Sequence, residues 1–116
     1  MTPERGDFVT VAAADVAPTY AALRDYTDPT DSFLKRIAAV SGQRVCAQGS
    51  TVTIDGAFAI TRAQHDSEDR PLPTWNGCHT LAPGEIFLLG DTEDSFDGRY
   101  WGPTPRSWVK GIWRPL

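Results

Sequence analysis

The sequence contains no long hydrophobic run. Its longest wholly apolar stretch, Ile86 to Leu89, has four residues, whereas a membrane-spanning helix needs about twenty. Residues 1–7 carry no positively charged region followed by an apolar stretch, so they do not encode a secretory signal. If the domain works outside the cytosol, the sequence that exports it is expected to lie outside this chain.

Positive charge is scarce as well. The 11 Lys and Arg residues are outnumbered by 15 Asp and Glu, which gives a net charge of −4, and the basic residues are scattered along the chain. A protein that binds a phosphate backbone needs clustered Lys and Arg side chains. A nucleic-acid partner is therefore not expected.

The composition is that of one folded domain of mainly β structure. The chain has 116 residues, 41% of them hydrophobic, which is enough to close one core and too few for two, so we expect a single domain over 1–116. Nine Pro and ten Gly divide it into short pieces, and no helical repeat lasts beyond about two turns. One of the predicted strand segments is a hairpin with Asp55-Gly56 at its turn, the pair that a type I′ turn favours. The predicted strand segments are 7–11, 32–40, 44–47, the hairpin 49–60, 85–90 and 109–113.

One short helix and two loops complete the predicted pattern. A helix is predicted over Val16–Tyr26, because Asp15 can cap it and Pro18 can occupy its first turn. Loops are expected at 64–75 and at 91–105.

Two cysteines, Cys46 and Cys78, leave two alternatives open. They can form one disulfide, which would stabilise a domain of this size by roughly 3 to 4 kcal/mol in the chain-entropy model, or they can be two buried free thiols. With His65 and His79 they lack the paired short spacings of a zinc site. We therefore expect no metal ion and no other cofactor.

The segment 90–103 is unusual for a solvated loop. It carries four carboxylates, one arginine, one serine and three aromatic residues directly after the most apolar segment. One interpretation is an internally packed loop, in which Arg99 forms a forked pair with Asp91 or Asp97. The other is that the loop supports an active site.

Lys35 is one of only two lysines and lies in an apolar segment. Strand alternation would place it on the same face as Phe33 and Ile37. Such a lysine usually extends its amine to solvent. The alternative is a desolvated amine whose pKa falls from about 10.4 toward neutrality, so that it can act as general base for a serine nucleophile.

Three ordered segments resemble conserved blocks of the type I signal peptidases. Residues 33–45 resemble the block that carries the catalytic lysine, and 90–102 resemble the last conserved block, while 5–11 are similar to an early Gly-Asp strand. The form Ser-Phe-Asp-Gly-Arg-Tyr and the cysteine pair point to the TraF-type branch, which acts in conjugative transfer and processes pilin precursors. The resemblance implies coiled antiparallel sheets with barrel-like curvature, of the signal-peptidase and LexA-like kind.

The resemblance also assigns catalytic and substrate-binding roles. It implies that Lys35 is the general base, that Ser95 orients its amine, and that Phe33 and Leu34 belong to the edge that receives a preprotein or pilin-like peptide. If so, the amine of Lys35 should be desolvated, within hydrogen-bond reach of Ser95, and out of salt-bridge reach of any carboxylate.

Four charged residues take structural roles under the same resemblance. Asp97 and Arg99 would form an ion pair, and Arg36, on the opposite strand face from the lysine, would take acidic partners from the Asp91–Asp97 loop. The family and the cysteines together imply a domain on the outer, periplasmic face of the bacterial cytoplasmic membrane, held there by an N-terminal anchor.

The sequence departs from the family pattern at the nucleophile. In the family the nucleophilic serine lies in a Ser-Met-Pro-like block, after the membrane anchor and before the Gly-Asp strand, but here Met1 comes five residues before Gly6. We therefore expect the nucleophile to be absent from this chain and the chain alone to be inactive, through truncation or through natural loss of catalysis. The alternative function is a non-catalytic module that binds an extended peptide on the same fold.

Overall fold

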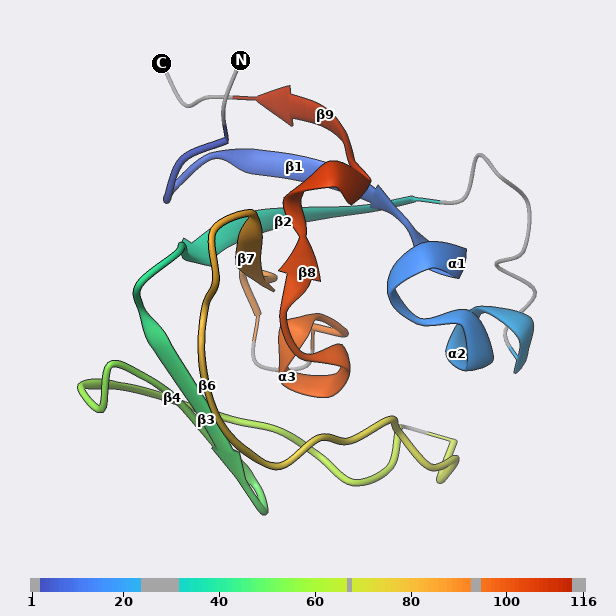
Figure 1. Cartoon of the computed structure of the whole chain (residues 1–116). Coiled ribbons are helices and arrows are strands. Elements are labelled where there is room, and N and C mark those ends of the chain that lie inside the picture. The colour runs from blue at the N-terminus through green and yellow to red at the C-terminus, as the bar shows by residue number, and fades with distance from the viewer. Residues whose placement is uncertain (1–2, 24–31, 67, 93–94, 114–116) are drawn as a thin grey trace.

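The computed structural model describes residues 3–23, 32–66, 68–92 and 95–113. Two antiparallel sheets form the body of the molecule (Figure 1). The first has the order β8-β7-β2-β1-β9, with β1 Phe8–Ala12, β2 Ser32–Ala39, β7 Glu85–Leu89, β8 Thr104–Pro105 and β9 Val109–Trp113. The second has the order β5-β4-β3-β6, with β3 Arg44–Gln48, β4 Thr51–Ile54, β5 Phe58–Thr61 and β6 Gly77–Thr80.

In the part of the chain that the structure describes, four short helical segments connect these strands. They are α1 Ala13–Val16, α2 Pro18–Leu23, α3 Gly98–Trp101 and the 3₁₀ turn Arg106–Trp108. In Figure 1, α1 and α2 lie beyond the end of β1, to one side of the sheets. Among the helices of the described residues, none has the length and apolar character needed to cross a membrane.

The alternation of β2 explains how the first sheet packs. Phe33, Lys35, Ile37 and Ala39 face inward with increasing burial along the strand, while the residues between them face outward and are more exposed. Two apolar clusters form the core. One lies where β2 and β7 meet β3 and β4, and contains Ala39, Val45, Ala47, Val52, Ile54, Leu81, Phe87 and Leu89. The other lies beneath α1 and contains Val9, Val11, Val16, Ala17, Ile37, Ile86 and Leu88.

The predicted fold class and hairpin are confirmed. The structure is mainly β with curled antiparallel sheets and few short helices. β4 and β5 pair in register around the predicted turn, where Asp55 and Gly56 have φ values of 54° and 69°. Positive φ at both central residues is the requirement of a type I′ turn.

The predicted helix Val16–Tyr26 is wrong in its extent. Within the described part of this range, Val16 is the last residue of α1 and residues 18–23 form α2. Ala17 between the two helices leaves the helical region with φ −147° and ψ 67°. Ala17 precedes Pro18, whose ring disfavours helical geometry at the residue before it. Residues 24–26 lie outside the described residues.

Three short elements were not predicted from the sequence. β6 was not predicted, and the predicted loop 91–105 contains α3 and β8. The side chains of β6 are all exposed, so this strand carries no inward hydrophobic alternation from which it could be recognised.

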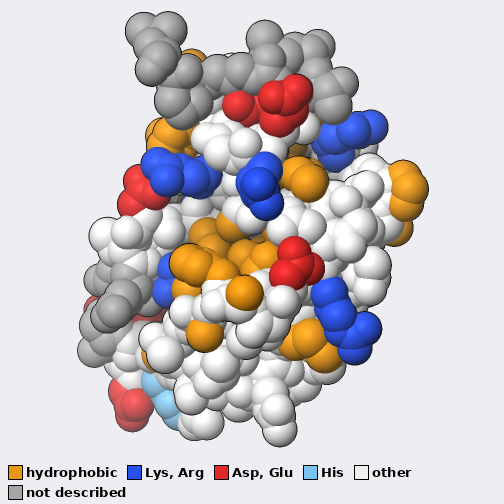
Figure 2. All heavy atoms as spheres, turned by 90° about the vertical axis from the view of Figure 1, so that its left-hand side faces the viewer, with side chains coloured by type: hydrophobic (Ala, Val, Ile, Leu, Met, Phe, Trp, Pro, Cys, Tyr) orange, Lys and Arg blue, Asp and Glu red, His pale blue; other side chains and the backbone are white. Residues whose placement is uncertain are grey.

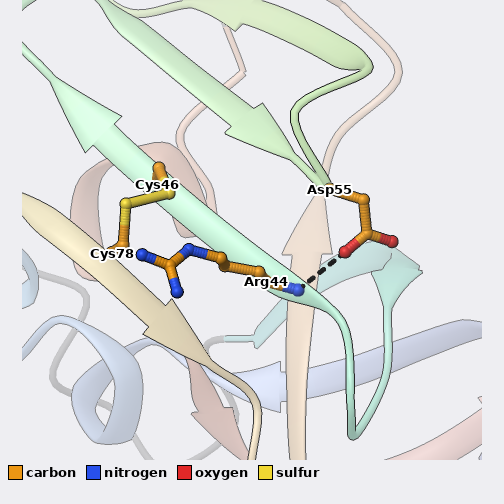
Figure 3. The surroundings of a disulfide bond; sticks show 4 residues. All are labelled: Arg44, Cys46, Asp55 and Cys78. Carbon is orange, nitrogen blue, oxygen red and sulfur yellow. Dashed lines mark hydrogen bonds between the residues drawn. A yellow bond between two sulfur atoms is a disulfide. The ribbon is translucent and has the colours of Figure 1, made fainter.

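A disulfide joins the two cysteines. Cys46 and Cys78 lie opposite each other on β3 and β6, and their sulfur atoms are bonded (Figure 3). At the start of β3 the backbone N–H of Arg44 donates to the carboxylate of Asp55 at 2.8 Å. This hydrogen bond and one from Gln43 hold the pKa of Asp55 below its usual value. The described residues contain no group of three His, Cys, Asp or Glu side chains placed to bind a metal ion.

Candidate active site

Lys35 lies just before the part of β2 that pairs with two strands, β1 and β7. It pairs with Val9 of β1 on one side, and on the other side the pairing with β7 begins one residue later, at Arg36 and Leu89. Its side chain is half-buried, with Nζ 5.6 Å from the centroid of the Phe33 ring. In the part of the chain that the structure describes, no carboxylate lies within salt-bridge distance of this amine.

Burial lowers the pKa of Lys35 below its ordinary value of 10.5. Desolvation is the largest cause, because it penalises the charged ammonium form. The carboxylates of Asp97 and Asp91 act in the opposite direction, and the guanidinium of Arg99 adds to the lowering. The net direction is the one that a lysine general base requires.

Ser95 and Lys35 border the same point in space, next to Gly90. A Cβ atom at Gly90 would overlap the Ser95 hydroxyl and would lie 3.2 Å from Lys35 Nζ. The absence of a side chain at Gly90 is therefore what lets both groups approach. This glycine was not singled out from the sequence, although it directly follows the most apolar strand segment.

The expected hydrogen bond between Ser95 and Lys35 is not formed among the described residues. The Ser95 hydroxyl instead lies 2.8 Å from Thr92 Oγ1 and accepts from the Thr92 backbone N–H at 3.3 Å. The backbone also closes a turn here, since Ser95 N donates to Thr92 O at 3.2 Å. This local turn supplies partners for the hydroxyl, which leaves Lys35 as a neighbour of Ser95 without a bond to it.

Asp97 and Arg99 form a buried ion pair directly behind Ser95. Arg99 Nε lies 3.1 Å from Asp97 Oδ1, and the two residues are 0% and 4% exposed. Asp97 also accepts from the backbone N–H of Gly90 at 2.8 Å and from that of Arg99 at 3.0 Å, so one carboxylate fixes both Gly90 and the start of α3. Arg99 donates further to the carbonyl groups of Thr61 and Thr92.

Arg36 pairs with Asp91 on the exterior. The two side chains are exposed, and Arg36 Nη2 lies 3.7 Å from Asp91 Oδ1. The guanidinium also covers the Phe8 ring at 4.7 Å. Arg36 thus takes an acidic partner on the opposite strand face from Lys35, as expected from the alternation.

Aromatic side chains form a wall beside Lys35. Phe33 stacks on Trp101 with centroids 5.6 Å apart and meets Phe96 edge-on at 5.9 Å. Phe96 in turn stacks on Tyr20 of α2 at 3.7 Å and on Tyr100 at 5.5 Å. The aromatic residues of segment 90–103 therefore pack internally, and Phe33 faces them. Leu34 points the other way and is 59% exposed.

Arg62, which follows β5, and Trp75, at the end of the predicted loop 64–75, both bond to the backbone of α3. Arg62 is buried and donates from Nη1 to the carbonyl of Arg99 at 3.0 Å. Trp75 Nε1 lies 3.1 Å from the carbonyl of Gly98 and from that of Arg99. Neither contact could be predicted from local sequence patterns, because each joins segments more than twenty residues apart.

Comparison with known proteins places this arrangement in a family. A family model described as signal peptidase, peptidase S26, matches residues 1–115. The chain belongs to this family. The membership predicted from the three sequence blocks is thereby confirmed.

Curated relatives of this S26 chain include conjugative-transfer proteins. The chain is similar to plasmid transfer protein TraF of Escherichia coli, at 36% identity over 90 residues, which covers 72% of the chain and 50% of the relative. It is similar to conjugal transfer protein TraF of Agrobacterium fabrum, at 36% identity over 86 residues, 72% of the chain and 48% of the relative. The chain thus spans about half the length of these relatives.

A solved structure supports the fold. The crystal structure of a signal peptidase I from Enterococcus faecalis superposes with a TM-score of 0.52 at 19% identity, and the match covers 97% of each chain. The signal-peptidase fold expected from the sequence is therefore the fold observed.

Proposed function

We propose that this chain is the lysine-bearing part of a serine endopeptidase that uses a Ser-Lys dyad and processes exported preproteins, such as pilin precursors, in conjugative transfer. The peptide substrate is supported by the signal peptidase family model, and the place in conjugative transfer by the TraF relatives. The choice of pilin precursors follows from the resemblance to the TraF-type branch alone. The domain works on the outer, periplasmic face of the cytoplasmic membrane, associated with it through a segment outside residues 1–116.

The state of the Lys35 amine is the observation that carries the proposal. It is half-buried, its pKa is lowered by desolvation, and it borders Ser95 at Gly90. A neutral amine can take the proton of a serine hydroxyl as the oxygen attacks the scissile carbonyl, and can return that proton to the leaving amine. This chemistry needs no metal ion and no organic cofactor.

Ser95 acts in this proposal as a positioning residue, and the nucleophile comes from outside this chain. Its hydroxyl is held by Thr92, which fixes it beside the amine. Phe33 and Leu34, which precede Lys35 on β2, contribute to the edge that receives the peptide. The chain alone is therefore expected to leave peptides uncleaved.

A chimera tests the proposal. The part of the E. coli TraF relative that lies outside the match is joined to residues 1–116, and cleavage of a pilin precursor is measured by gel and mass spectrometry. The chimera should cleave, Lys35→Arg should abolish cleavage while keeping a positive charge, and Lys110→Arg should leave it intact. Cleavage that persists in Lys35→Arg would contradict the dyad.

The same chimera distinguishes the non-catalytic alternative. If it binds the precursor but leaves it intact while the TraF relative cleaves it, the chain is a peptide-binding module. Binding without turnover would then be unaffected by Lys35→Arg.

A further inference from the structure

A cavity of about 510 Å³ lies between α2, α3 and residues 61–72, which begin at the end of β5. Figure 1 shows this segment at the lower right of the molecule, beneath both helices. The cavity has the size of a small-molecule site, for which about 300 to 1,000 Å³ is usual. We name it the Tyr100 cavity, after a residue that lines it. Lys35 and Ser95 do not line it, so it is separate from the candidate active site.

One wall of the Tyr100 cavity is aromatic. Tyr20, Phe96 and Tyr100 line it, and the Phe96 ring stacks on the other two rings. Leu72 adds an aliphatic side chain to the lining. Rings and aliphatic side chains of this kind favour a ligand with a flat apolar group.

The hydroxyl of Tyr100 has a hydrogen without an acceptor. Tyr100 is 4% exposed, and its oxygen accepts from the backbone N–H of Ala63 at 2.9 Å. Among the described residues, no atom accepts the hydroxyl hydrogen in return. A buried tyrosine hydroxyl usually donates to a partner, because leaving it unbonded costs free energy. An acceptor bound in the cavity would complete its hydrogen bonding.

The guanidinium of Arg62 is also incompletely bonded. Arg62 is 7% exposed, and three of its five N–H groups donate, to the carbonyls of Gly49 and Arg99 and to Asn76 Oδ1. The other two have no acceptor in the described ranges, and no carboxylate there lies within salt-bridge distance of this side chain. Burial therefore lowers the pKa of Arg62, and only Tyr100 acts against this effect.

The lining of the Tyr100 cavity carries more positive than negative charge. It contains two guanidiniums, those of Arg62 and Arg70, and one carboxylate, that of Asp66. Arg70 Nε lies 2.9 Å from Asp66 Oδ2, and Arg70 also pairs with Glu68, which is outside the lining. His65 is exposed at the cavity and adds positive charge only when it is protonated. The charge of Arg62 is therefore the one left uncompensated in the described lining.

The hollow on the face shown in Figure 2 has no such excess. Hydrophobic side chains gather around it, with charged side chains of both signs about them. Arg36 is paired with Asp91 there, and Arg5 acts through space on Asp55. Because its charges compensate one another, we assign this hollow no ligand.

The unbonded donors of the Tyr100 cavity belong to side chains, whereas nearby main-chain groups are already bonded. The N–H of Arg62 donates to the carbonyl of Ser50, and that of Ala63 is held by the tyrosine hydroxyl. The carbonyl of Thr61 accepts from Arg99 Nη1 at 3.2 Å. The segment therefore does not suit an extended peptide that adds a strand, and a ligand would be bound by a polar group of its own.

A carboxylate matches these donors and this charge. Its two oxygens offer about four acceptor sites, enough for the Tyr100 hydroxyl and the two remaining N–H groups of Arg62. Its single negative charge equals the uncompensated charge of the lining. A phosphate group would bring about −1.5 to −2 at neutral pH, which exceeds it.

We propose that the Tyr100 cavity binds a carboxylate attached to a flat apolar group. The hydroxyl of Tyr100 donates to the carboxylate, the guanidinium of Arg62 compensates its charge, and the apolar group packs against the aromatic wall. A free aromatic acid has this chemistry, and so has the C-terminus of a peptide that ends in an aromatic residue. The inference does not depend on the proposed peptidase function, because Lys35 has no part in it.

Four probes test the inference on residues 1–116. Phenylacetate is compared with phenylacetamide, and the tripeptide Gly-Gly-Phe with the same tripeptide amidated at its C-terminus, by titrations followed through backbone amide NMR shifts. In at least one pair the carboxylate should bind about tenfold more tightly than the amide and shift the signals of 61–63 and 98–101. The pair with the tighter carboxylate identifies the source, a free acid or a peptide end. Equal binding of acid and amide in both pairs, or signals of 61–63 and 98–101 that stay unchanged, would overturn the inference.

Two variants and a control separate the donors. Tyr100→Phe keeps the ring and should weaken the tighter carboxylate about tenfold, and Arg62→Met should remove the preference over the amide. Arg106→Met removes an exposed guanidinium that lines a different cavity and should leave binding unchanged. If Tyr100→Phe bound the carboxylate as tightly as the unchanged chain does, the inference would be wrong even where Arg62→Met fails to fold.

Discussion

The two sheets are held in shape by different means. In the first sheet the segment around Ser95 is fixed by the buried Asp97–Arg99 pair and by stacked aromatic rings. In the second, the edge strand β6 has only exposed side chains, and the disulfide ties it to β3. A strand that buries little apolar surface gains little stability from packing, so in β6 the disulfide supplies the stability that packing does not. The segment around Ser95 depends instead on buried polar contacts.

The largest loss of stability is expected from breaking the polar network. Arg99→Met leaves the Asp97 carboxylate buried without its partner, which should reduce the free energy of unfolding by about 3 to 5 kcal/mol. Urea denaturation measures it. Arg36→Met, which breaks the exposed pair with Asp91, is the control and should change stability by less than about 1 kcal/mol. Equal losses of stability from the two substitutions would show that burial does not determine how much an ion pair contributes to stability.

The next largest effect is expected in the second sheet. Replacing both cysteines by serine, Cys46→Ser with Cys78→Ser, opens a link across 32 positions and should reduce the free energy of unfolding by about 3 to 4 kcal/mol. Chemical reduction of the unchanged chain should give the same loss. The NMR signals of Lys35 and Ser95 should stay in place, and their displacement would contradict the separation of the two regions.

A smaller effect is expected from crowding the site. Gly90→Ala places a Cβ 2.5 Å from that of Ser95 and 3.2 Å from Lys35 Nζ, and overpacking of this kind costs about 1 to 3 kcal/mol. Adding Ser95→Gly removes the atoms that clash and should recover most of the loss, which a double-mutant cycle by urea denaturation measures. If the stability losses of Gly90→Ala and Ser95→Gly simply added, contact with Ser95 would not be the reason that position 90 requires glycine.

The two regions also differ in what their sequence could reveal. Lys35 could be placed because strand alternation puts it with Phe33 and Ile37, and the Asp55-Gly56 pair specifies its own turn. Both signals are local. The strand β6 could not be predicted, because its position is set by pairing with β3 and not by its own residues.

Most contacts around Lys35 and Ser95 could not be predicted from the sequence. The resemblance to the signal peptidases implied that Ser95 lies near Lys35, but it did not indicate the turn in which the Ser95 hydroxyl bonds to Thr92. The sequence predicted that Arg99 pairs with a nearby aspartate. It did not predict the hydrogen bonds of Arg99 with Thr61 at the end of β5, with Arg62 or with Trp75. Such contacts depend on how distant strands meet.

The smallest expected effect on stability concerns Lys35. Because its pKa is lower in the folded chain than in the unfolded one, the unfolded chain binds more protons between the two pKa values. Stability should therefore rise with pH through that interval. Lys35→Met should be more stable than the unchanged chain at neutral pH, and the difference should vanish above pH 10.5. If the stability advantage of Lys35→Met increased with pH, the pKa of Lys35 would be raised on folding and the account would be wrong.

The titration of the Lys35 amine tests the account most directly. In the Lys110→Arg variant Lys35 is the sole lysine, so its side-chain NMR signal can be followed without overlap as the pH is raised. The account predicts a midpoint below the ordinary value of 10.5, because burial disfavours the ammonium. A midpoint at or above 10.5 would mean that nearby carboxylates stabilise the ammonium form more than burial disfavours it, and would contradict the role of Lys35 as general base.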